Sequence, residues 1–268
     1  GQFDRGRLAF ERAREQWLAI GDRRRAAAAL LGVADLAHGA GNLADAVSLS
    51  RAAAKECDAE SLAYFALRAR SIECNVMGDR GRKRESLECS ESVTDGLREL
   101  GEWNEVAVRD VSSANTWIGL GDLDRARRRL DSSLEQLAVL SPVVRGRLHA
   151  AWGNWWIATG DPGTAAIHYR QAAAELAGGG TVADQADVDF KLARIARLAG
   201  AADEERRLLE QLLGRLESTD ARSAKAQVEL RLGQLALDAG DLARAATHQQ
   251  SAAASCSALD DYDCTVPA

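Results

Sequence analysis

Along the chain, small and large side chains recur at helical spacing around a repeated glycine. The glycine follows a run of helix-forming residues and in most cases precedes Asp or Asn, as in "GNL", "GDL" and "GDP". Its occurrences, which are 37 to 43 residues apart, are Gly1, Gly41, Gly78, Gly121, Gly160, Gly200 and Gly240. A period in this range is typical of repeat proteins, in which each repeat is one supersecondary unit.

The positions that follow each glycine define one face of a helix. In most repeats the side chain is small five residues after the glycine, large nine residues after it and small again twelve residues after it, as at Ala165, Tyr169 and Ala172. Spacings of four and three place such positions on one side of an α-helix. Glycine ends a helix at no steric cost, and Asp or Asn caps the next one. The pattern predicts helix–turn–helix units: the second helix of a truncated unit, then six full pairs.

The unit around Gly160 resembles a tetratricopeptide repeat (TPR). The resemblance is carried by Trp152-Gly153-x-x-Trp156, by the Gly160-Asp161 turn and by Ala165-x-x-x-Tyr169-x-x-Ala172. The segments "VADLAHGAGNLADAVSLSRAA" and "LGQLALDAGDLARAATHQQSA" follow the same outline, so the resemblance covers residues 1–259. It implies an all-α fold, a right-handed α-α superhelix or TPR-like solenoid of about six helix pairs plus a leading half-repeat.

The chain departs from the usual TPR pattern in two ways. Its period is nearer 40 residues than 34, and the unit at Gly78 has Arg70 and Lys83 where apolar or small residues are expected. HEAT-like repeats share this period but lack the small and large columns around a Gly-Asp turn, so they rank second. Long-period TPR units resemble the C-terminal sensor arrays of bacterial multidomain transcriptional regulators. We therefore expect the chain to be a fragment of a larger protein.

Composition and charge narrow the class of protein. The chain has 268 residues, only three prolines and a net charge of −6. An acidic chain without a basic domain is a poor candidate for nucleic-acid binding. Five scattered cysteines without a CxxC motif indicate reduced thiols in a cytoplasmic protein. No apolar run is long enough to span a bilayer, and the acidic end, 260–268, is expected to be disordered.

Three of the six tryptophans lie between Trp152 and Trp156, which raises the question of an aromatic ligand box. Trp152 and Trp156 occupy the apolar columns of their repeat, so we expect both to lie in the core. Trp155 is one residue off that face, and we expect it at the edge of the packing.

Few motifs indicate catalysis or metal binding. The four histidines, about one per repeat, form no HExxH motif, and the cysteines add no converging set of zinc ligands. The glycine-rich segment 177–184 lacks the preceding strand and the Lys-Ser/Thr of a phosphate-binding loop. The arginine clusters at 23–25, 80–84 and 125–129 are each preceded or followed by acidic residues and are interpreted as solvated faces. We expect no cofactor, no metal and no enzymatic activity.

One polar column is the candidate binding site. Six residues before each turn glycine stand Asp35, Ile72, Asn115, Asn154, Arg194 and Gln234. Arg147, Lys191 and Arg231 are expected nearby on the same helices. The TPR resemblance implies that the first helix of each pair lines the concave face, where Asn and basic side chains bind peptide backbone and carboxylates. The alternative is that any exposed helix face is polar.

These patterns indicate a non-catalytic protein- or peptide-binding scaffold, the regulatory region of a larger cytoplasmic signalling or transcriptional regulator. The expected partner is a protein or peptide on the concave face, with a small anionic effector as a further possibility. Direct nucleic-acid or membrane binding is not expected. The alternative function is an array that senses a small-molecule effector, and an enzyme with an unrecognised site ranks third.

Overall fold

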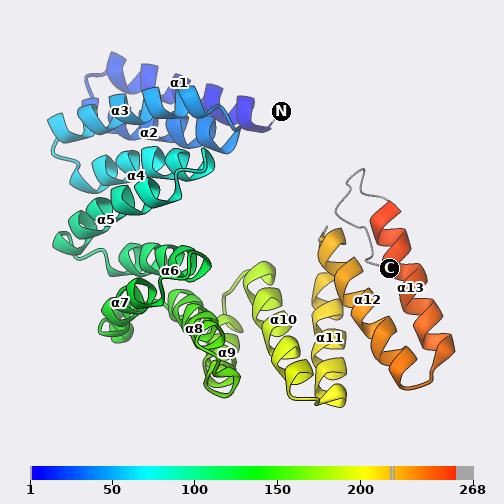
Figure 1. Cartoon of the computed structure of the whole chain (residues 1–268). Coiled ribbons are helices and arrows are strands. Elements are labelled where there is room, and N and C mark those ends of the chain that lie inside the picture. The colour runs from blue at the N-terminus through cyan, green and yellow to red at the C-terminus, as the bar shows by residue number, and fades with distance from the viewer. Residues whose placement is uncertain (1, 218, 220, 258–268) are drawn as a thin grey trace. The chain divides into compact units, whose positions relative to one another are not determined.

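The computed structural model describes residues 2–217, 219 and 221–257 (Figure 1). The helices group into two compact units, Gly1–Val139 and Leu140–Ala268. The first unit contains α1 (Gln2–Ala19), α2 (Arg23–Gly39), α3 (Leu43–Ala59), α4 (Ala63–Asp79), α5 (Lys83–Glu99), α6 (Trp103–Gly119), α7 (Leu123–Leu134) and the short 3-10 helix η1 (Leu137–Val139). The second contains α8 (Pro142–Ala158), α9 (Pro162–Leu176), α10 (Val182–Leu198), α11 (Ala202–Leu216), α12 (Arg222–Asp238) and α13 (Leu242–Ser257).

Within each unit, every helix packs against the next one along the chain (Figure 1). The described residues contain thirteen α-helices and no strand. In the first unit, α1 precedes three helix pairs, and the second unit consists of three more pairs. The prediction of an all-α array with a leading half-repeat and six helix pairs is therefore confirmed. The expected acidic end, 260–268, lies outside the described residues.

The long period comes from helix length. Most helices have 17 residues, and each tight turn has a residue with positive φ. In the first unit these residues recur every 20 positions, at Gly21, Gly41, Ser61, Gly81, Gly101 and Gly121. At one such turn, Gly41 N–H donates to His38 O and Asn42 N–H donates to Ala37 O, both at 2.9 Å. These bonds satisfy carbonyls at the helix end, so one repeat is two 20-residue halves.

The turn between α4 and α5 is made by Gly81, not Gly78. Gly81 has φ +78°, whereas Gly78 lies inside α4, which continues to Asp79. The sequence prediction was therefore wrong by three residues in this repeat, and the unit is less degenerate than it looked. The position six residues before the turn is Asn75, which is exposed, and Ile72 is a core residue with 2% exposure.

Small and large columns build the core between the paired helices, as predicted. Ala165 and Ala172 are fully buried and Tyr169 is nearly so. A Cβ atom at Gly153 would lie 2.5 Å from the Tyr169 ring. The absence of a side chain at Gly153 therefore allows α8 and α9 to approach each other around that ring.

The tryptophans are part of the core, with one correction. Trp152 is buried, and Trp156 is half-buried and packs against the cluster around Tyr169. Trp155 is also buried, so its expected place at the edge was wrong. Its ring meets those of Trp152 and Trp156 edge-to-face, with centroids 5.7 and 4.8 Å apart. Buried residues surround most of the circumference of α8, so a position off the apolar columns is not exposed there.

The interpretation of all cysteines as reduced thiols was wrong for one pair. A disulfide joins Cys74 of α4 to Cys89 of α5, whose Cα atoms are 5.4 Å apart. The antiparallel hairpin brings together two residues 15 positions apart, which a search for CxxC cannot find. Cys57 is a buried free thiol, and burial together with Glu56 and Asp58 raises its pKa to about 11. No helix in the described part of the chain has the length and apolar character needed to span a bilayer.

Candidate binding grooves

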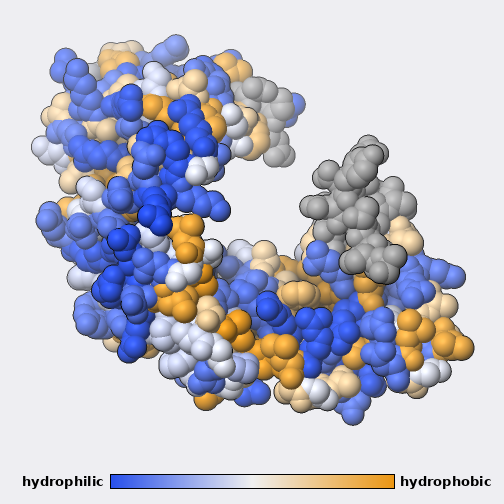
Figure 2. Space-filling model, in the orientation of Figure 1, coloured by the Kyte–Doolittle hydropathy of each residue, from blue (hydrophilic) through white to orange (hydrophobic). Residues whose placement is uncertain are grey.

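The second unit has a groove where α10 and α12, the first helices of two successive pairs, flank α11. It has a volume of about 480 Å³. Its lining, which we call the α10–α12 groove, is Phe190, Ala193, Arg194, Arg197, Glu205, Leu209, Gln227, Leu230, Arg231 and Gln234. Three residues of the predicted site are therefore brought together here, namely Arg194, Arg231 and Gln234. In Figure 2 the surface over these helices shows hydrophilic and hydrophobic side chains next to one another.

Of the three arginines that line this groove, one forms an ion pair with a carboxylate of the described part of the chain and two do not. Arg231 donates two hydrogen bonds to the Glu205 carboxylate, at 2.7 and 2.9 Å, and these bonds raise the pKa of Arg231. Glu205 is almost fully buried, so Arg231 closes the floor with a neutral ion pair. Arg194 and Arg197 are exposed, and no carboxylate of the described residues forms an ion pair with either. The groove therefore retains two positive charges.

The rest of the α10–α12 groove is largely apolar. Leu209 and Ala193 are buried in its floor, and Leu230 is half-buried. Phe190 remains 41% exposed. Phe190, Arg197 and Leu230 were not among the predicted site residues. Phe190 and Arg197 lie four residues before and three residues after Arg194, on the same helix face, and this spacing could have indicated them.

Two other predicted residues, Arg147 and Lys191, form ion pairs within the protein. Arg147 forms a two-fold ion pair with Asp184, at 2.9 Å for each bond, and this pair raises the pKa of Arg147 and lowers that of Asp184. Lys191 Nζ lies 2.6 Å from Asp187 Oδ2. The charges of Arg147 and Lys191 are therefore compensated within the protein. The Arg147–Asp184 pair links α8 to α10, and the Lys191–Asp187 pair lies within α10.

Asn154 is occupied by Tyr169. The Tyr169 hydroxyl donates a 2.7 Å hydrogen bond to Asn154 Oδ1, and Lys191 Nζ lies 5.8 Å from the centroid of the Tyr169 ring. Burial raises the pKa of Tyr169. Tyr169 stands nine residues after Gly160, as Leu209 stands nine residues after Gly200. Leu209 forms the floor of the α10–α12 groove. At the equivalent place between α8 and α10, the larger side chain of Tyr169 occupies the space.

Asn115 lies in the first unit, in an equivalent groove. This α4–α6 groove has a volume of about 550 Å³ and includes Asn75, Lys83, Ser86, Ser90, Ser112, Ser113, Asn115 and Thr116. Asn75 and Asn115 occupy the column that holds Arg194 and Gln234 in the second unit. The lining is rich in hydroxyl and carboxamide groups and has one ammonium group, on Lys83. Asp35, the remaining member of the predicted column, lies 3.5 Å from the Arg68 guanidinium.

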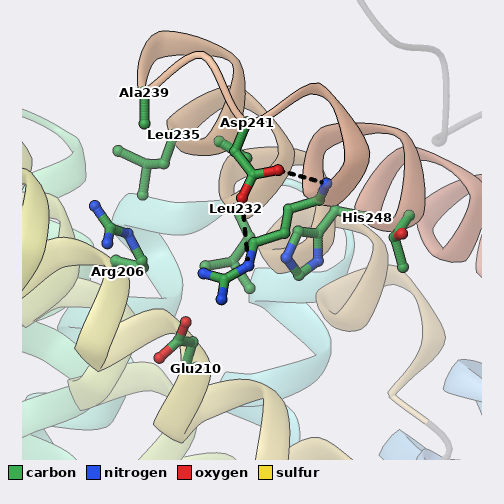
Figure 3. Close-up of a pocket in the computed structure, with 10 residues that line it drawn as sticks. Arg206, Glu210, Leu232, Leu235, Ala239, Asp241 and His248 are labelled. Carbon is green, nitrogen blue, oxygen red and sulfur yellow. Dashed lines mark hydrogen bonds and ion pairs between the residues drawn. The ribbon is translucent and has the colours of Figure 1, made fainter.

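A third groove opens between the second helices α11 and α13 (Figure 3). Its volume is about 430 Å³. Arg206 and Glu210 lie on one side, Asp241 and His248 on the other, and Leu232 and Leu235 form part of the apolar lining. Here Arg244 pairs with Asp241 at 3.4 Å and Arg206 with Asp203 at 3.0 Å. Because both signs of charge are present and largely paired, this groove has little preference for the charge of a ligand.

Two histidines meet beside the tryptophans. His149 Nδ1 and His168 Nδ1 are 3.3 Å apart, and the His168 ring stacks on Trp152 with a centroid distance of 5.9 Å. Burial lowers both pKa values, and His149 lowers that of His168 further. Nothing in the sequence pattern indicates this pair, because only the turn between α8 and α9 brings the two histidines together. Within the described residues no three His, Cys, Asp or Glu side chains form a possible metal site.

The fold is shared with proteins of known structure. The sequence matches no protein-family model and no curated protein. Solved structures that resemble it include the Cut9–Hcn1 assembly of the APC/C, with TM-score 0.69 and 14% identity over 96% of this chain and 45% of that chain. The STAND protein PH0952 from Pyrococcus horikoshii, which has a tetratricopeptide repeat sensor, gives TM-score 0.64 and 11% identity over 93% of this chain and 40% of that one.

The apo quorum sensor NprR from B. thuringiensis gives TM-score 0.61 and 10% identity over 94% of this chain and 83% of that chain. These structures establish a tetratricopeptide-repeat fold for the chain. The chain spans less than half the length of Cut9 or PH0952.

Proposed function

We propose that this chain of TPR fold is a non-catalytic scaffold that binds a partner polypeptide on the inner face formed by the first helices of its pairs. The observation that carries the proposal is the pair of uncompensated arginines, Arg194 and Arg197, at an apolar groove of a chain whose net charge is −6. Other exposed arginines of the second unit have acidic partners, as Arg207 has in Glu204 and Arg244 in Asp241, and the exposed Arg170 lines none of the grooves described above. A cationic groove adds little to the solubility of an acidic protein, but it suits ligand binding.

The scaffold would act within a larger cytoplasmic regulator of bacterial type, including a regulator of transcription. Support comes from the part-length match to the STAND protein, whose TPR region is a sensor, and from the match to the quorum sensor NprR. Both likenesses are of fold, at 11% and 10% identity, so the biological context is part of the proposal.

A second candidate function is sensing of a small polar or anionic effector. The α4–α6 groove favours it, because its volume of about 550 Å³ falls in the range of small-molecule sites. Ser86 and Ser112 offer hydroxyl groups with no protein partner among the described residues, and Lys83 adds a positive charge.

The proposed function is tested with dodecapeptides selected from a random phage-displayed library on the full chain. We expect Arg194→Ala with Gln234→Ala to weaken binding of a selected peptide by about tenfold or more, since charge-assisted contacts are lost. The matched control is Arg170→Ala with Arg207→Ala, two exposed arginines of α9 and α11 that line none of the grooves. If the control substitutions weaken peptide binding and the substitutions of Arg194 and Gln234 do not, the peptide binds outside the inner face.

A further inference from the structure

The α10–α12 groove contains an aromatic side chain, Phe190, that is partly exposed to solvent. Phe190 lies at the middle of α10 and is 41% exposed. Leu230 lines the same groove from α12, and Leu209 closes its floor from α11. Covering such a surface with an apolar side chain removes it from water, which is favourable in proportion to the area covered. The groove volume of about 480 Å³ accommodates a leucine or phenylalanine side chain.

The charges beside this wall have one sign. Arg194 and Arg197 are three residues apart on α10, so their guanidinium groups share a face, and like charges at this spacing weaken a helix. By contrast, Arg206 and Arg207 of α11 each have an acidic partner three residues earlier. Among the described residues that line the α10–α12 groove, Glu205 supplies the one carboxylate, and it pairs with Arg231. The guanidinium groups of Arg194 and Arg197 therefore remain available to a carboxylate ligand, and their planar geometry suits bidentate ion pairs.

We propose that the α10–α12 groove binds an acidic, apolar segment of the partner polypeptide. A leucine or phenylalanine of the partner packs against Phe190 and Leu230, and a glutamate or aspartate within a few residues of it pairs with Arg194 and Arg197. This inference rests on the proposed function, because it names the chemistry of the partner that the inner face binds. Both elements are needed: the apolar contact supplies surface burial, and the carboxylate fixes direction and register.

The test changes the peptide and then the protein. In each peptide selected on the full chain, every Glu or Asp is replaced by Gln or Asn, and every Leu or Phe by Ser, one at a time. We expect acidic residues near Leu or Phe to be enriched among the selected peptides, and either kind of replacement to weaken binding by about tenfold.

A charge swap then separates direct contact from general electrostatics. The variant Arg197→Glu should lose affinity for the selected peptide and bind its Glu→Lys form about tenfold more tightly than the unchanged chain does. The matched control, Arg170→Glu on α9, introduces the same charge change outside the groove and should rescue nothing.

The outcomes distinguish the two proposals. One outcome is that binding of the selected peptides depends on Arg194 and Gln234 and yet survives replacement of the acidic or apolar residues of the peptides. In that case the inner face binds polypeptide, and the proposal of an acidic, apolar segment is wrong. Peptides that bind independently of the inner face, or a library that yields no binder, contradict the proposed function itself, and the inference falls with it.

Discussion

The hydroxyl of Tyr169 donates a 2.7 Å hydrogen bond to Oδ1 of Asn154, and through this contact α9 reaches the inner face beside α8. The same column holds Arg194 on α10, where the neighbouring side chain is the smaller Leu209 and a groove is present. One large side chain at a repeated position therefore decides which part of the inner face remains available in the second unit.

The first prediction concerns this contact. Asn154→Ala leaves the nearly buried Tyr169 hydroxyl without its partner, so the free energy of unfolding should fall by about 1–3 kcal/mol. Asn154→Ala combined with Tyr169→Phe removes both partners and should recover part of that loss. Urea unfolding measures the stabilities, and binding of the selected peptide should be unchanged in both variants. A loss of binding equal to that of the variant with Arg194→Ala and Gln234→Ala would show that Asn154 contacts the ligand.

The turn pattern gives the second prediction. Ser61 occupies a turn position with φ +57° that Gly21, Gly41 and Gly81 occupy in equivalent turns. Because a left-handed conformation is unfavourable for serine and not for glycine, Ser61→Gly should raise the free energy of unfolding of the first unit by about 1 kcal/mol. Gly101→Ser, at the next equivalent turn, should lower it. Thermal unfolding of both variants provides the measurement, and equal melting temperatures would contradict the explanation.

The disulfide gives the third prediction. Cys74 and Cys89 enclose a loop with a sequence separation of 15. A cross-link over a loop of this size lowers the conformational entropy of the unfolded chain and so raises the free energy of unfolding by about 3 kcal/mol. Reduction with dithiothreitol should lower the stability of the first unit by a similar amount. The control, Cys74→Ser with Cys89→Ser, should have the reduced stability with and without dithiothreitol. If mass spectrometry shows complete reduction and the unfolding curve does not move, the bond adds nothing to stability.

The histidine pair gives a pH dependence of defined sign. Burial holds the pKa of His149 and His168 below the usual value of 6.5, so the folded state disfavours their protonation. Stability is therefore fully present above pH 6.5 and falls as the pH decreases below it. Glu175 and Arg145, which face His149, pair with each other, and the pKa of Glu175 is lowered from 4.5, outside this window.

We expect tryptophan-monitored urea unfolding to show the same stability at about pH 8 and pH 7 and a lower stability at about pH 5.5. His168→Gln removes one titrating group and the repulsion between two imidazolium rings, so its curve should be flatter. An identical pH dependence in the variant would mean that other groups cause the loss.

The sequence predicted the helix pairs because the glycine turns and the small and large columns are local signals. It failed at Gly78 because two glycines stand three residues apart near one turn, and only the length of α4 decides between them. It predicted Arg194 and Gln234 from their column and Arg231 near them, but not which carboxylates compensate the charges of the arginines. The pairing of Arg231 with Glu205, and the filling of the position at Asn154 by Tyr169, depend on which side chains meet between helices.

The most direct test of the central claim is hydrogen–deuterium exchange of the full chain with and without a selected peptide. If the inner face is the binding surface, exchange should slow in segments 190–197 of α10 and 227–234 of α12, which line the groove. Exchange in segment 241–248, which comprises Asp241 and the start of α13 and lines the groove between α11 and α13 (Figure 3), should not change. Slower exchange in 241–248 with no change in 190–197 would contradict the account.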